Sequence, residues 1–191
     1  MKKLSLIIAT VLVLGVTSIS KAQDDSDVAT HNVSFNVPEI ALLDIEGNKD
    51  IVFDLNGIVN EAGNDIDLTS ATNNELWLNY TVLTGSKGKS GSKEQKISVS
   101  LDKEIPGINL MLKVGADKGN GAGAKGTLST SSVFAIKDNT STEIIKGIGS
   151  CYTGNGTENG HNLAYSLEVD KFEEIVAGDH SVTVTYTFTD K

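Results

Sequence analysis

The chain has 191 residues, with 16 basic and 25 acidic side chains and a net charge of −9. None of the basic residues is an arginine, and an acidic chain without the side chain best suited to bidentate phosphate recognition argues against nucleic acid as a partner. The length is sufficient for one domain with a real core, and the lone cysteine, Cys151, excludes an internal disulfide.

The first 22 residues have the features of a secretory signal peptide. Lysines at positions 2–3 precede an apolar run over residues 4–16, and Ser-Lys-Ala at 20–22 places small residues where a signal peptidase needs them. The apolar run of 13 residues is shorter than the roughly 20 needed to span a bilayer. We therefore predict cleavage after Ala22, export as a secreted or cell-surface protein, and a mature chain, residues 23–191, without a membrane span. Losing three lysines and no acid changes its net charge to −12.

Apolar and polar residues alternate along the first half of the mature chain with the period of two that is typical of β-strands. Residues 32–37 are predicted as a strand with Val33, Phe35 and Val37 inward, and residues 50–55 as another. Between them Pro38 interrupts hydrogen bonding, and a short extended piece ends at Gly47. Residues 75–83 are apolar on both faces, which indicates a central strand.

The second half continues the pattern between glycine-rich segments. Residues 84–96 contain no apolar side chain and are predicted as a flexible hairpin tip, and residues 117–126 as a second flexible loop. Residues 127–161 are less regular and indicate short strands, or a strand and one helical turn. Further strands are predicted at residues 97–101, 108–114, 162–169 and 181–189.

The last strand separates its side chains most clearly. Val182, Val184, Tyr186 and Phe188 share one face and are predicted to face the core, so that a charge at Val184 should unfold the domain; threonines at 183–189 fill the other face. Eight to ten strands without room for crossover helices predict an all-β fold, an antiparallel β-sandwich in a single domain, residues 23–191.

No set of residues makes a convincing active site, so we predict a non-enzymatic protein without a cofactor. Gly-Lys-Ser at 88–90 lacks the earlier glycine of a phosphate-binding loop, because Leu83 stands there, and a strand rather than a helix follows. Residues 179–181 (Asp-His-Ser) are consecutive and cannot form a catalytic triad. Cys151 and His161 lack a helix N-terminus that would lower the thiol pKa.

Metal and sugar sites are also weakly indicated. Histidines 31, 161 and 180 share no ligand spacing, so no metal site is predicted, although acidic clusters at 24–27 and 65–67 leave calcium open. Trp77 lies in the most apolar segment, where burial is the simpler reading. The threonine row at 183–189 has no second strand that repeats it, which argues against a flat binding plane.

Two segments carry a resemblance to a known family. VSFNVPEIALLDIEG at 33–47, and AGDH at 177–180 followed by SVTVTYTF, resemble the terminal strands of bacterial fimbrial (pilin-like) subunits of the spore-coat-U and archaic chaperone-usher type. The resemblance implies an immunoglobulin-like sandwich that polymerises by lending an N-terminal strand to its neighbour. The natural donor is then residues 24–37. Its donor-strand residues share one face: Ala29, Val33, Phe35 and Val37.

These features together lead to one functional hypothesis and one alternative. The hypothesis is an exported, non-enzymatic structural or adhesive subunit that self-associates into fibres. The alternative is a monomeric extracellular module that binds a glycan or another ligand. The chain departs from the resemblance in one respect, because those subunits commonly carry a disulfide between early strands and here the single cysteine lies late.

Overall fold

The computed structural model describes residues 28–57, 61–85 and 94–190; the predicted signal peptide, residues 1–22, lies outside them. The chain divides into two parts, residues 1–36 and 37–191. In the first part, the described residues 28–36 form neither helix nor strand. The strand predicted at 32–37 with inward apolar side chains is therefore wrong: Val33 and Phe35 are 75% and 86% exposed, because no ladder in the described chain provides a partner for them.

In the second part, residues 37–191, nearly all of the regular secondary structure in the described residues consists of strands. Its described elements are β1 (Ile40–Glu46), β2 (Thr72–Leu83), β3 (Gln95–Leu101), β4 (Ile108–Asp117), β5 (Ala122–Leu128), β6 (Phe134–Ala135), β7 (Thr142–Tyr152), β8 (His161–Val169), the 3₁₀ helix η1 (Phe172–Glu174) and β9 (Val184–Asp190). None of the helices among the described residues is long and apolar enough to cross a membrane.

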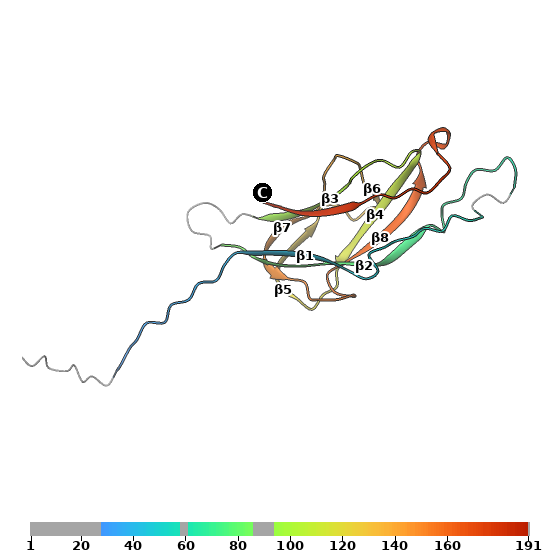
Figure 1. Cartoon of the computed structure of the whole chain (residues 1–191). Helices are drawn as coiled ribbons and strands as arrows, with labels where there is room; N and C mark the ends of the chain where they lie inside the picture. The colour runs from blue at the N-terminus through green and yellow to red at the C-terminus, as the bar shows by residue number, and fades with distance from the viewer. Residues whose placement is uncertain (1–27, 58–60, 86–93, 191) are drawn as a thin grey trace, which may run out of the picture. The chain divides into compact units, whose positions relative to one another are not determined.

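All nine strands belong to one antiparallel sheet, whose main path runs β6-β4-β8-β2-β7-β3-β9 (Figure 1). Strand β1 adds to β2 and strand β5 adds to β7, off this path. Every ladder between named strands is antiparallel. The predicted all-β, antiparallel, sandwich-like fold is confirmed.

One hydrophobic cluster joins strands from distant parts of the sheet path. Leu112 of β4 and Leu163 of β8 belong to the same buried cluster as Ile97 and Val99 of β3. The sheet therefore turns its inner faces toward each other, as the two layers of a sandwich do. Strand β2 is central, as predicted, because it pairs with β1, β7 and β8.

Several local predictions differ from the structure. Residues 84–96 do not close a hairpin, because β2 and β3 are separated by β7 in the sheet. Residues 50–55 form no strand, although Ile51 and Phe53 pack on the core as their alternation indicated. The predicted loop at 117–126 contains the start of β5, and the irregular region 127–161 contains the eleven-residue strand β7.

Candidate strand-acceptor groove

Strands β1 and β9 each have one edge without a partner strand among the described residues, as do β5 and β6. Strand β1 pairs only with β2, and β9, at the end of the sheet path, pairs only with β3. No ladder joins β1 to β9 in the described part of the chain. Such edges present rows of unpaired backbone donors and acceptors, which another strand can bind.

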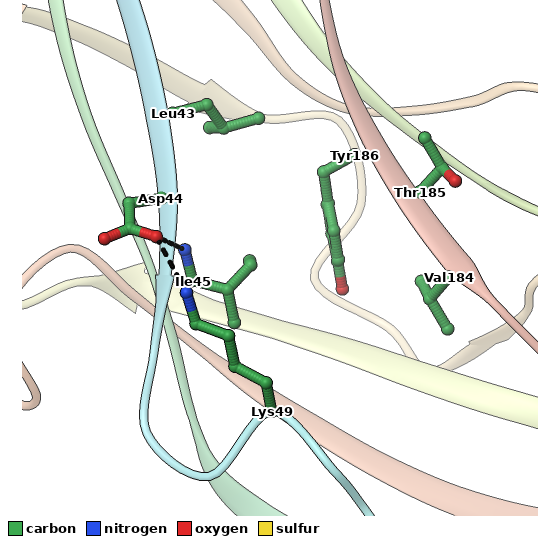
Figure 2. A pocket seen from close by; sticks show the side chains of 7 residues that line it. All are labelled: Leu43, Asp44, Ile45, Lys49, Val184, Thr185 and Tyr186. Carbon is green, nitrogen blue, oxygen red and sulfur yellow. Dashed lines mark hydrogen bonds and ion pairs between the residues drawn. The ribbon is translucent and has the colours of Figure 1, made fainter.

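A hollow of about 320 Å³ lies between these two strands (Figure 2). Leu43 and Ile45 extend into it from β1, and Val184 and Tyr186 line it from β9. We call this hollow and the two flanking edges the acceptor groove. At its rim the Lys49 ammonium donates to Asp44, with Nζ 3.1 Å from Oδ1. The groove is therefore lined by apolar side chains of both strands together with Thr185 and the Asp44–Lys49 ion pair.

The apolar side chains along the groove are only half-buried. They pack against the hydrophobic core, yet each retains part of its surface in solvent: Leu43, Ile45, Val184, Tyr186 and Phe188. The predicted core-facing side of the last strand is thus correct in direction, but nothing in the described chain covers its open flank. An additional strand in the groove would remove this apolar surface from water.

Strand β9 is held firmly on its inner side. The Tyr186 and Tyr165 hydroxyl oxygens lie 2.5 Å apart, and burial raises the pKa of Tyr165 to about 12 and that of Tyr186 well above its ordinary value. At the start of the strand, the Thr183 N–H donates to the Asp102 carboxylate at 2.8 Å, a bond that lowers the pKa of Asp102. These contacts tie β9 to Tyr165 of β8 and to Asp102, which follows β3.

The proposed donor residues lie outside the sheet and are exposed. Val33, Phe35 and Val37 are 75%, 86% and 62% exposed, and Ala29 is exposed as well. All the described residues from 28 to 39 are exposed, and these apolar side chains alternate with polar ones along the segment. The structure thus shows an uncovered apolar row on the domain and an uncovered apolar row on residues 29–37.

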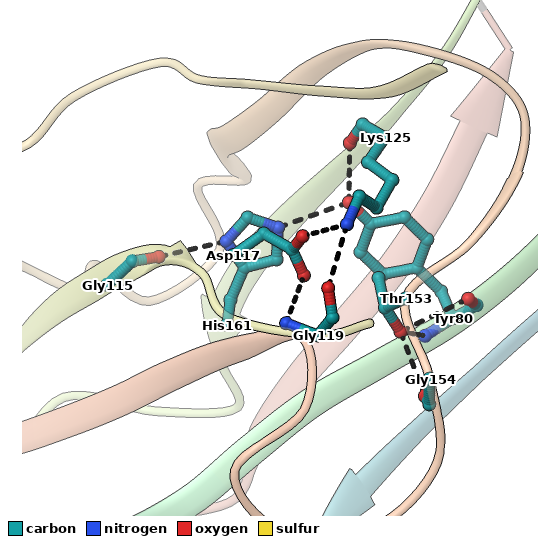
Figure 3. A network of polar contacts seen from close by, with 8 residues as sticks. All are labelled: Tyr80, Gly115, Asp117, Gly119, Lys125, Thr153, Gly154 and His161. Atoms are coloured by element: carbon teal, nitrogen blue, oxygen red, sulfur yellow. Dashed lines mark hydrogen bonds and ion pairs between the residues drawn. The ribbon is translucent and has the colours of Figure 1, made fainter. Parts of the chain in front are cut away.

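Cys151 and His161, considered in the sequence as a nucleophile and a base, are both buried. Burial raises the pKa of the Cys151 thiol to about 11, which keeps it protonated and unreactive. His161 belongs instead to a polar network inside the sandwich (Figure 3). Beside it, Lys125 forms an ion pair with Asp117 and donates to the Gly119 carbonyl at 3.2 Å.

The donor–acceptor distances in this network indicate which atoms of His161 and Tyr80 carry hydrogens. His161 Nδ1 lies 2.9 Å from the Gly115 carbonyl oxygen, which only accepts, so Nδ1 carries a hydrogen. His161 Nε2 lies 3.1 Å from the Tyr80 hydroxyl, which lies 2.5 Å from the Lys125 carbonyl oxygen. If His161 is neutral, its Nε2 is an acceptor, as is the Lys125 carbonyl oxygen. The single Tyr80 hydroxyl proton then has two acceptors and can be donated to only one of them at a time. A protonated His161 would satisfy all three contacts, but its charge would be buried.

Burial is the larger effect and lowers the pKa of His161, although the Gly115 carbonyl and Asp117 act against it. An unfolded histidine titrates near pH 6.5, so below this pH the unfolded chain binds more protons than the folded one. We expect the free energy of unfolding to fall between pH 7.5 and 5.5, which urea titrations can measure. His161→Gln should remove this dependence and the exposed His180→Gln should keep it; an unchanged dependence in His161→Gln would refute the assignment.

The structure does not bring the remaining candidate residues that it describes together into a catalytic, metal or sugar site. His180 lies in an exposed turn, with Nε2 2.7 Å from the Val176 carbonyl oxygen, and the exposed Asp67 accepts from Thr69. No group of three metal-ligating side chains occurs among the residues that the structure describes. Trp77 is 9% exposed beneath the Lys118 ammonium, which lies 5.6 Å from its ring centre, so its face offers no open platform for a sugar.

Comparisons of the chain with protein-family models, with curated proteins and with solved structures found no match.

Proposed function

We propose that the protein is an exported, non-enzymatic structural subunit that assembles by receiving residues 29–37 of another copy in its acceptor groove. The observation that carries the proposal is the paired exposure of two apolar rows, one between β1 and β9 and one on residues 29–37. Addition of a strand to an open sheet edge is a common mode of recognition, in which main-chain hydrogen bonds give affinity and alternate side chains give specificity.

Burial of the three apolar side chains alone does not make insertion of the segment favourable, so backbone hydrogen bonds must also contribute. Burying each of Val33, Phe35 and Val37 contributes roughly 1.5–3 kcal/mol. Ordering nine residues costs roughly 1–2 kcal/mol per residue, which exceeds this gain. Hydrogen bonds to the open edges of β1 and β9, and burial of the half-exposed groove side chains, must therefore supply the remainder.

Pro38 disfavours insertion of the segment into its own groove. Only Pro38 and Glu39 separate Val37 from the start of β1. A tight hairpin back along β1 would make them the two loop residues, and two-residue hairpins need a positive φ at the first of these positions. Proline fixes φ near −65°. The segment is thus better suited to the groove of a second copy.

The proposal is tested by separating the segment from the groove. Deletion of residues 24–37 should leave a folded monomer, and a peptide of residues 28–39 should raise its melting temperature in a concentration-dependent way. A control peptide with aspartate in place of Val33 and Phe35 should have no effect. If the peptide does not change the melting temperature, and the full chain stays monomeric in sedimentation at high concentration, the proposal fails.

A further inference from the structure

The groove strand β9 carries two distinct faces. Its half-buried face consists of Val184, Tyr186 and Phe188, and its exposed face consists of Thr185, Thr187 and Thr189. Residues 32–37 have the same two-sided pattern, with Val33, Phe35 and Val37 on one side and Asn32, Ser34 and Asn36 on the other. A strand paired with β9 must match these faces, because directly opposite residues point to the same side of a sheet.

We propose a single register for the inserted segment: it runs antiparallel to β9 with Phe35 opposite Tyr186. This inference rests on the proposed function. Val37 then faces Val184 and Val33 faces Phe188, while Ser34 falls opposite Thr187 on the solvent side. Phe35 is the largest side chain of the segment and enters the hollow that Tyr186 lines, where an aromatic cross-strand pair is favourable.

Displaced registers conflict with the groove. A shift by one residue turns all three apolar side chains to solvent. A shift by two residues in one direction places His31 opposite Phe188, and in the other direction it places Glu39 opposite Val184. Each of these shifts puts a polar or charged side chain against the apolar wall, which costs free energy unless the group finds a partner.

The antiparallel direction continues the pattern of this sheet, in which every ladder between named strands, including the one that joins β9 to β3, is antiparallel. Tyr186 cannot easily swing away to accommodate other arrangements, because its hydroxyl is held 2.5 Å from that of Tyr165.

Cysteine pairs on the solvent-facing side test the register without touching the core. In a Cys151→Ala background, a chain with Ser34→Cys is mixed with a chain carrying Thr185→Cys, Thr187→Cys or Thr189→Cys, under thiol–disulfide exchange. Opposite residues in a sheet lie within disulfide reach. We expect at least a tenfold excess of the mixed disulfide dimer with Thr187→Cys over the other two.

The other outcomes separate the register from the function. Preferred crosslinking to Thr185→Cys or Thr189→Cys overturns the register but leaves strand insertion standing. Equal crosslinking at all three positions also overturns the register. So does the absence of crosslinks if the peptide of residues 28–39 still stabilises the chain that lacks residues 24–37. Absence of every crosslink together with absence of peptide stabilisation overturns the proposed function itself.

Discussion

Aspartate in place of Phe35 is expected to abolish assembly and to leave the domain as stable as before. Phe35 is 86% exposed, so the fold gains nothing from it in the single chain. In the groove, the change removes about 1.5–3 kcal/mol of apolar burial and adds the cost of an unpaired carboxylate facing Tyr186. A loss above about 3 kcal/mol weakens each contact more than 100-fold.

Sedimentation and negative-stain microscopy measure this loss, and the melting temperature of the variant checks its fold. The matched control is Asn36→Asp, which adds the same charge one residue away on the side facing solvent, and which should assemble nearly as the unchanged chain does. Normal filaments from Phe35→Asp, or equal loss in both variants, would contradict the assignment of Phe35 to the groove.

Alanine in place of Gly121 is expected to destabilise the domain at the upper end of the roughly 1–3 kcal/mol typical of overpacking. A Cβ at this position would overlap the carbonyl oxygen of Tyr152, so the backbone between β4 and β5 must move away from the end of β7. Gly121 is thus required by close approach rather than by loop flexibility. Urea unfolding of the variant measures the loss.

Gly149→Ala provides the comparison within the neighbouring strand β7. Its added Cβ would meet only the Cβ of Ala124, at 3.1 Å, and alanine costs less conformational entropy than glycine in a strand. We expect a change within about 1 kcal/mol. Equal stability of the two variants would show that the β4–β5 connection relaxes freely, contrary to the close packing described.

The alternation of apolar residues predicts most of the strands, because it reflects which side chains the core must bury. Residues 75–83, 97–101 and 162–169 all lie in strands of the structure. Alternation alone does not show whether a partner exists. Residues 32–37 and 50–55 have the same alternating pattern, yet neither range forms a strand or pairs with one.

The sequence alone does not show which strands pair when they lie far apart along the chain. Residues 84–96 have hairpin composition, but the strands on either side of them, β2 and β3, are separated by β7 in the sheet. The glycines at 119 and 121 predicted flexibility, while they allow the chain to pass against β7. Nor does any spacing bring Tyr80, Asp117, Lys125 and His161 together; only the fold does.

In residues 29–37 the alternating pattern predicts which side chains share one face, although these residues form no strand. Ala29, Val33, Phe35 and Val37 share one face in the sequence, and the structure leaves that face uncovered. The hollow beside β9 could not be foreseen, because it depends on β1 and β9 lying near each other without pairing.

Pro38 has a consequence for any polymer that the protein forms. If a subunit cannot satisfy its own groove, every chain of subunits ends with one vacant groove at one extremity and one unused segment at the other. Such head-to-tail contacts are heterologous and do not close on themselves unless the rotation between subunits forms a ring. The fibre would therefore be polar, and each extremity would stay open to further subunits until a different molecule caps it.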